Sequence, residues 1–185
     1  VLRRRQRQMC IRDRTWTGTG SSHAITGYGF SPDFAWIKSR SNTASHALLD
    51  TVRGNSNVLR SDNTTAENTG NTSVWTSFDS DGFTLGADNN NGWTNWNNWT
   101  YVGWAWDAGS STVSNTDGSI TSNVRANTSA GFSIVGYTGT GSNATVGHGL
   151  NAAPEFVIVK SRDMSSSDWC VYHLSLIHIS EPTRL

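Results

Sequence analysis

The sequence predicts an all-β protein whose antiparallel strands pack as a β-sandwich. Short β-prone runs alternate with turn-forming Gly, Asn, Asp and Ser residues, and no segment has a convincing helical period of about 3.6 residues. The composition agrees, because only 15% of the 185 residues are charged whereas 9 are Trp and 18 are Gly. A polar chain with aromatic residues at strand-like spacing is more typical of extracellular or virion β-proteins than of cytosolic enzymes.

Several runs along the chain predict individual strands. The runs FAWIK at 34–38 and FVIVK at 156–160 follow Pro and polar residues, as expected of buried strands. Asp81-Gly82 is a hairpin signal directly before the β-prone segment 83–85. The run YVGWAW at 101–106 alternates small and large residues, so we expect a central strand of the sandwich there.

The segment after this strand is different in character. Residues 108–131 are rich in Ser, Thr and Asn and contain too few apolar residues to form a core. The segment is predicted to be a linker, or a loose hairpin around Asp117-Gly118.

An internal repeat divides the chain. The segment TGTGS at 17–21 recurs at 138–142, and the segment KSR at 38–40 recurs at 160–162, each with similar residues around it. The spacing indicates a duplicated module of about 120 residues, which is an ordinary domain size. We therefore predict a complete sandwich module at 15–107, called copy one, and a truncated second repeat at 132–173, called copy two.

The two ends of the chain are interpreted as translated sequencing adapter. Residues 9–14 can be encoded by ATG TGT ATA AGA GAC AG, and the reverse complement of that DNA encodes residues 174–179. Two unrelated peptide ends are not expected to be complementary in this way. We assign residues 1–14 and 174–185 to adapter and leave them out of the functional interpretation, as is done with tags. The alternative is a basic arm and an apolar docking tail.

Setting the ends aside changes the charge of the chain. The whole chain has a formal net charge of +0, but residues 15–173 carry 7 Lys and Arg against 12 Asp and Glu, a net charge of −5. This balance argues against a nucleic-acid partner. Cys170 is the single cysteine of this range, so no intrachain disulfide or Cys-based zinc site is expected. No apolar run approaches the roughly 18 residues of a membrane span.

The strongest candidate for a binding site is the run NNNGWTNWNNWT at 89–100. Tryptophan recurs there at every third position with Asn between. Indole rings stack on sugar rings, and Asn amides both donate and accept hydrogen bonds with hydroxyl groups. The predicted glycan-binding residues are Trp93, Asn95, Trp96, Asn98 and Trp99. The alternative is that these tryptophans close one end of the sandwich or pack against another subunit.

Two further motifs resemble cofactor or metal sites without meeting their requirements. TGTGS lacks the Gly-Lys-Ser/Thr of a phosphate-binding loop, so we interpret it as a turn at the end of a strand. Asp79-x-Asp81-Gly82 resembles a calcium loop, but the glycine is misplaced and Asn90 stands where the bidentate Glu belongs. We predict a tight hairpin here, with neither cofactor nor metal; calcium is the alternative.

The histidines do not form a catalytic pattern. His46 with Asp50 could provide a general base, and His148 or His173 could be ligands, but no nucleophile motif or pair of acids accompanies them. No catalytic residue is predicted.

The motifs taken together resemble a known family. GYGFSPDFAWIKSR, HALLDTVRG, SDGFTLG, YVGWAWDAG and TVGHGLNAAPEFVIVKSRD are similar to the repeated module of tail-associated structural proteins of marine bacteriophages, across nearly all of 15–173. The resemblance implies a virion tail or tail-fibre component with a concanavalin A-like or related jelly-roll sandwich. It also implies partners among other tail subunits, including copies of the same chain, and it carries over no catalytic residues.

We therefore expect a non-enzymatic virion module that forms part of a tail or tail fibre and binds a host cell-surface glycan. One alternative is a glycan-degrading enzyme of the sandwich class, which needs two carboxylates facing a groove. The other is a repeat of an adhesin on the bacterial cell surface.

Overall fold

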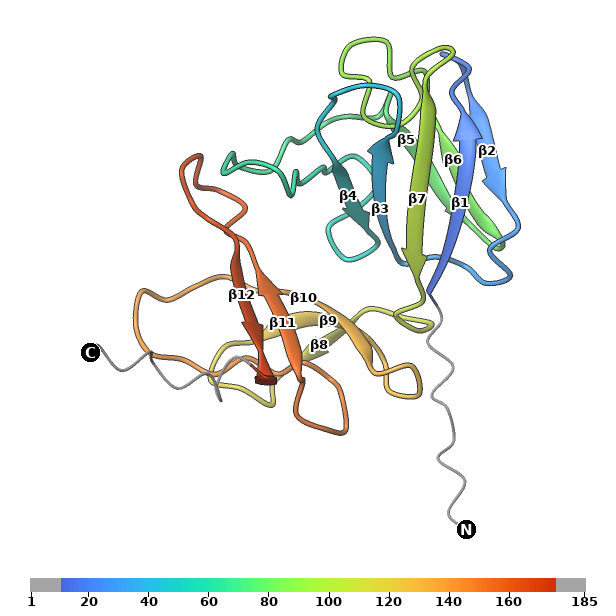
Figure 1. Ribbon diagram of the computed structural model, residues 1–185. Helices are drawn as coiled ribbons and strands as arrows, with labels where there is room; N and C mark the ends of the chain where they lie inside the picture. Colours follow the sequence, from blue (N-terminus) through green and yellow to red (C-terminus); the bar gives the residue numbers. More distant parts are fainter. Residues whose placement is uncertain (1–10, 176–185) are drawn as a thin grey trace, which may run out of the picture.

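The computed structural model describes residues 11–175, which form twelve β-strands and no α-helix (Figure 1). The predicted all-β class is confirmed. Within the same residues no helix is long and apolar enough to cross a membrane. The strands are β1 (Ile11–Thr17), β2 (His23–Thr26), β3 (Phe34–Ser39), β4 (Ala47–Asp50), β5 (Trp75–Asp79), β6 (Gly82–Leu85), β7 (Thr100–Trp106), β8 (Val113–Asn115), β9 (Ser122–Asn127), β10 (Phe132–Gly136), β11 (Phe156–Val159) and β12 (Cys170–His173).

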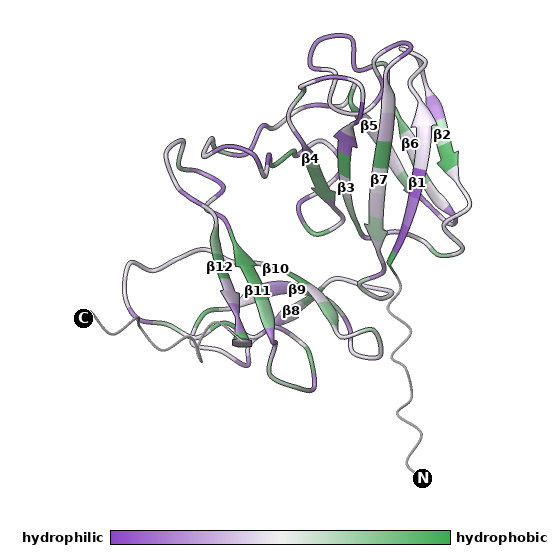
Figure 2. Cartoon of the chain, in the orientation of Figure 1, coloured by the Kyte–Doolittle hydropathy of each residue, from purple (hydrophilic) through white to green (hydrophobic). Residues whose placement is uncertain are grey.

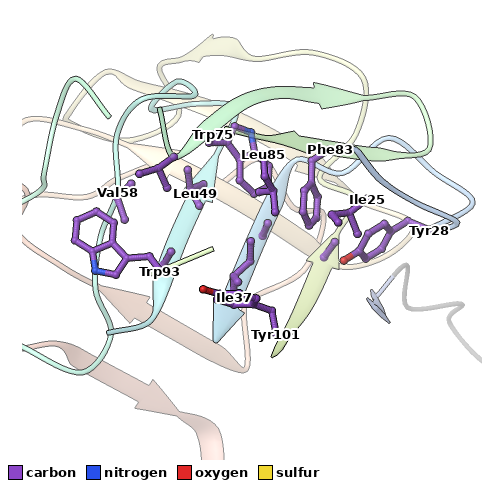
Figure 3. Packing of buried hydrophobic residues seen from close by; sticks show 14 residues of the cluster. Ile25, Tyr28, Ile37, Leu49, Val58, Trp75, Phe83, Leu85, Trp93 and Tyr101 are labelled. Atoms are coloured by element: carbon purple, nitrogen blue, oxygen red, sulfur yellow. The ribbon is translucent and has the colours of Figure 1, made fainter. Parts of the chain in front are cut away.

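Copy one is a sandwich of two antiparallel sheets, as predicted. The front sheet has the strand order β1-β7-β3-β4 and the back sheet has the order β2-β6-β5. The apolar core lies between them, with side chains from both sheets pointing toward one another (Figure 3). Its largest fully buried members are Trp75, Tyr28, Tyr101, Phe83, Ile37, Leu49 and Leu85. The finer jelly-roll or concanavalin A-like assignment stays a prediction.

Strand β7 turns Tyr101, Gly103 and Ala105 toward the core and Val102, Trp104 and Trp106 outward. Gly103 and Ala105 face the core, and a Cβ on Gly103 would lie 2.9 Å from the ring of Trp16. Aromatic rings from neighbouring strands thus occupy the space that larger β7 side chains would need. Trp104 and Trp106 lie on the outer face and are half-buried. The alternation in the sequence predicted the strand but not which face is buried.

Of the two structures predicted for residues 108–131, the linker and the hairpin, the structure shows the hairpin. Strands β8 and β9 pair around the turn that holds Asp117-Gly118, and β9 also pairs with β10. Val124 of β9 is 1% exposed. The segment is ordered because β9 has a partner on each edge, which the low apolar content of the sequence did not reveal.

The strands of copy two repeat the pairing of copy one. By the repeat anchors, β10, β11 and β12 correspond to β1, β3 and β4. Phe156 pairs with His173 as Phe34 pairs with Asp50, and the following pairs keep the same register. Among residues 11–175, however, no strand takes the place of β7 beside β11. Strand β11 is apolar (Figure 2), and its residues Phe156, Ile158 and Val159 are exposed.

One contact between the two copies is made by the loop between β11 and β12. Arg162 donates two hydrogen bonds to Glu67, at 2.7 and 2.9 Å, and the indole N–H of Trp169 donates to the carbonyl oxygen of Arg60 at 3.2 Å. The Glu67 side chain is 4% exposed and that of Arg162 is 44% exposed. The contact is a polar one that reaches a buried carboxylate of copy one.

Strand β1 begins four residues before the predicted start of copy one. Ile11 pairs with Trp106, and the pairing continues through Arg14. Backbone pairing at a sheet edge requires little of the side chains, so it does not test the adapter origin of these residues, which stays a prediction. The rest of the predicted adapter, 1–10 and 176–185, lies outside the described residues.

Candidate functional site

The Trp/Asn loop, defined as residues 93–99, lies between β6 and β7 at one end of the sandwich. Its base is fastened by Asp88, which is 1% exposed and has a φ of 42°. The Asp88 carboxylate accepts hydrogen bonds from the backbone N–H of Thr94 at 2.6 Å and of Asn95 at 3.4 Å. Burial raises the pKa of Asp88, and these backbone donors oppose that shift. The loop therefore starts from a fixed, buried anchor.

Asn95 connects the loop to two other segments. Its side-chain oxygen accepts from the N–H of Thr19 at 2.9 Å, and its amide nitrogen donates to the carbonyls of Ser21 and Gly86 at 2.6 and 2.7 Å. Asn95 is fully buried. Its amide is occupied inside the protein, so Asn95 positions the loop rather than facing a ligand.

The TGTGS turn packs directly against the loop. The N–H of Gly18 donates to the carbonyl of Trp99 at 2.7 Å, and the N–H of Asn98 donates to the carbonyl of Gly18 at 2.9 Å. A Cβ on Gly18 would lie 2.2 Å from the carbonyl oxygen of Trp96, so only glycine allows this approach. The turn supports the Trp/Asn loop, in agreement with a turn rather than a phosphate cradle.

The first tryptophan of the loop belongs to the core. Trp93 is 5% exposed, and the guanidinium of Arg60 lies 5.5 Å from its ring centroid. Next to it, the hydroxyl of Tyr101 donates to the carbonyl of Gly92 and accepts from the N–H of Trp96. Burial raises the pKa of Tyr101 to about 12, so the hydroxyl stays neutral at physiological pH.

The remaining part of the loop forms an exposed rim. Trp96 and Trp99 are half-buried, with ring centroids 5.4 Å apart and an interplanar angle of 30°. Asn97 and Asn98 between them are exposed, and Asn98 has a φ of 63°. The ring of Trp99 rests over Gly92, where a Cβ would lie 2.4 Å from it. The rim therefore consists of two indole rings, with the exposed side chains of Asn97 and Asn98 between them in the sequence.

The five predicted glycan-binding residues are therefore close in space but differ in role. Trp93 and Asn95 are buried and serve packing and positioning, as the packing alternative expected. Trp96, Asn98 and Trp99 lie on the rim, where Asn98 is exposed, Trp96 is half-buried and Trp99 also packs against the core. The sequence could not separate the two groups, because every third residue of this irregular loop does not share one face.

The model of a family described as Domain of unknown function (DUF7483) matches residues 10–185. The chain belongs to this family. No curated protein and no solved structure matches it. The DUF7483 match includes residues 10–14 and 174–185, so it does not separate the predicted adapter segments from the rest.

In this DUF7483 chain the acidic residues of the calcium-like motif are used internally. The carboxylate of Asp81 accepts from the backbone N–H of Gly29 at 2.5 Å and of Gly27 at 3.0 Å, and these bonds lower the pKa of Asp81. Asp79 accepts from the hydroxyls of Ser77 and Thr84, both at 2.7 Å. In the part of the chain that the structure describes, no three His, Cys, Asp or Glu side chains are grouped as metal ligands would be.

His46 and Asp50 also have structural partners. The indole N–H of Trp36 donates to Nδ1 of His46 at 2.7 Å, and burial lowers the pKa of His46. Asp50 forms an ion pair with Arg53 at 2.5 Å and caps the N–H of Val52 at 3.0 Å. The two predicted general-base partners are therefore not hydrogen-bonded to one another. His148 accepts from the N–H two residues on, within its own turn.

The front sheet also carries an outer aromatic ladder, which the sequence did not predict. Phe34 lies opposite Trp106 with centroids 5.1 Å apart, and Trp36 lies opposite Trp104 with centroids 6.4 Å apart. The ring of Phe132 in β10 stacks on Trp106 at 6.1 Å. Aromatic residues two apart in both strands are the signal for such a ladder, but the same pattern predicts buried, central strands equally well.

Proposed function

We propose that this DUF7483 chain is a non-enzymatic virion tail or tail-fibre module that binds a host cell-surface glycan through the rim of the Trp/Asn loop. The observation that carries the proposal is the half-buried pair of Trp96 and Trp99 beside the exposed side chains of Asn97 and Asn98. Flat apolar faces next to amides that donate and accept are the chemistry that a sugar ring requires.

The rim is supported from beneath, which favours binding. The Trp96 backbone N–H donates to Tyr101, and the Asn98 N–H donates to Gly18, so the segment between the two rings is held at both ends. Rings that are already ordered lose little conformational freedom when a ligand arrives. A pre-ordered surface of this kind suits the repeated sugars of a surface polysaccharide.

The assignment to a virion tail rests on the sequence. Tandem copies, the acidic charge of residues 15–173 and the resemblance to phage tail modules support it. Tail and fibre proteins assemble from many subunits, so we propose other tail subunits, including copies of this chain, as partners.

The proposed glycan site is tested with single substitutions in the full chain on a glycan array. Trp96→Ala removes one face of the pair, and Asn98→Gly removes an amide while keeping a residue that accepts a φ of 63°. We expect each to weaken binding by about fivefold, since stacking or one hydrogen bond contributes about 1 kcal/mol.

Trp169→Ala is the matched control, because Trp169 is also a half-buried tryptophan but lies in copy two. It should bind as the parent does. If Trp96→Ala remains folded by circular dichroism and binds like the parent, the glycan site on this rim is excluded.

Two further assays distinguish the proposed module from the two alternatives. A glycan-degrading enzyme would release reducing ends from a bound polysaccharide, whereas the proposed module leaves it intact. An adhesin repeat would be found in cell-envelope fractions, whereas a tail module would be found in purified virions by antibody labelling.

A further inference from the structure

The central strand β3 of copy one is paired on both edges. It bonds to β4 on one side and to β7 on the other. Against β7, Phe34 is opposite Trp106, and Trp36 is opposite Trp104. The front sheet therefore shows which strands pair with the two edges of a β3-type strand.

The equivalent strand β11 is paired on one edge only. It bonds to β12, and no other described strand joins that sheet. Phe156 is 55% exposed, Ile158 is 44% exposed and Val159 is 39% exposed, whereas Ile37, the counterpart of Val159, is fully buried. An apolar strand with a free edge is a ready template for another strand.

Strand β11 is held in place at its C-terminal end. Lys160, the residue after the strand, donates to the carbonyl of Thr64 at 3.3 Å, and Arg162 is bonded to Glu67. These contacts involve the loop and not residues 156–159. The loop therefore anchors the strand pair without using the backbone groups along the free edge.

We propose that the free edge of β11 binds an antiparallel strand of the β7 type, with Gly and Ala at the centre of one face and two Trp residues on the other. In the register of copy one, Phe156 lies opposite Trp106 and Ile158 lies opposite Trp104 of the incoming strand. Val159 lies opposite Gly103, on the face that carries the small residues. This arrangement covers the exposed side chains and satisfies the free backbone groups at the same time.

The occupant is identified by the repeat itself. Within the described chain, β7 is the strand that pairs with a β3-type edge, and its alternation of Tyr101, Gly103 and Ala105 against Val102, Trp104 and Trp106 matches that edge face by face. A shift of one residue would place the aromatic rings on the wrong face. The site should therefore discriminate between strands of equal composition.

The test uses the full chain and a synthetic peptide with the sequence of residues 98–109, NWTYVGWAWDAG. Binding is followed by the fluorescence anisotropy of a labelled peptide and by hydrogen–deuterium exchange of the protein. We expect one peptide per chain and amide exchange at residues 156–159 that slows by about tenfold. Exchange in β3 should not change, because both edges of β3 are already paired.

The matched control is a peptide in which the Gly and Trp of positions 103 and 104 are exchanged. It has the same composition and charge but reverses the two faces at its centre, so it should give no protection. Equal protection by both peptides would indicate nonspecific coating and would overturn the proposal. So would protection of other strands instead of β11, or a dimer joined through β11 that the peptide does not dissociate.

Discussion

Strand pairs β3–β4 and β11–β12 have the same register and opposite environments. Ile37 and Leu49 of the first pair are fully buried, whereas their counterparts Val159 and Tyr172 in the second pair are 39% and 43% exposed. The comparison shows that local sequence is sufficient to pair two strands, since both copies form the same ladder. Burial requires more, because it depends on β7 and on the back sheet, which lie elsewhere in the chain.

The two TGTG turns also differ in how closely other residues pack against them. A Cβ on Gly18 of copy one would lie 2.2 Å from a backbone oxygen, whereas a Cβ on the equivalent Gly139 meets nothing within 4 Å. The sequence is the same in both turns. The Trp/Asn loop that makes Gly18 necessary is present beside only one of them.

The largest expected effect on stability comes from replacing equivalent residues of β3 and β11 by alanine. Ile37→Ala should lower the free energy of unfolding by about 3 kcal/mol, because it removes buried carbons and leaves a cavity. Val159→Ala should cost less than about 1 kcal/mol, since Val159 is 39% exposed. Urea denaturation followed by near-ultraviolet circular dichroism measures both. Equal losses would mean that copy two is packed as tightly as copy one.

A middle-sized effect is expected at the turns. Gly18→Ala should destabilise the protein by about 1–3 kcal/mol, since the new methyl group meets rigid backbone. Gly139→Ala should change stability by less than about 0.5 kcal/mol. Thermal unfolding of the two variants beside the parent provides the comparison. A Gly18→Ala protein as stable as the parent would show that the turn and the Trp/Asn loop are not in close contact.

The smallest expected effect is a pH dependence of folding stability that arises at Glu67, in the contact between the two copies. Burial raises the pKa of Glu67, but the hydrogen bonds and charges of Arg162 and Arg53 outweigh burial and hold the pKa below its usual value of 4.5. The folded protein thus binds this proton less tightly than the unfolded chain does. The resulting stability is present above that usual value and is lost as the pH falls through the lower, folded pKa.

The measurement for Glu67 is the free energy of unfolding between pH of about 6 and about 3, in the parent and in Glu67→Gln. We expect the parent to lose more stability on acidification than the variant. The same slope in both proteins would show that Glu67 does not couple pH to folding.

Part of this structure was visible in the sequence. The strand runs at 34–38, 101–106 and 156–160, the hairpin at Asp81-Gly82 and the repeat anchors were all recognised, because each depends on a few neighbouring residues. The division of the Trp/Asn loop was not visible. Asn95 is buried because Thr19, Ser21 and Gly86 reach it from other segments, and no local pattern reveals such partners.

Local sequence decided where strands form, where they turn and how β11 and β12 align, since strand period and turn chemistry act between near neighbours. Tertiary structure alone decided which face of β7 is buried. There the rings of Trp16 and Tyr28, from β1 and the loop after β2, lie against Gly103 and occupy the space beside β7. It also decided which tryptophans of the Trp/Asn loop remain on the surface. Burial is a property of two surfaces that meet, and one stretch of sequence specifies only one of them.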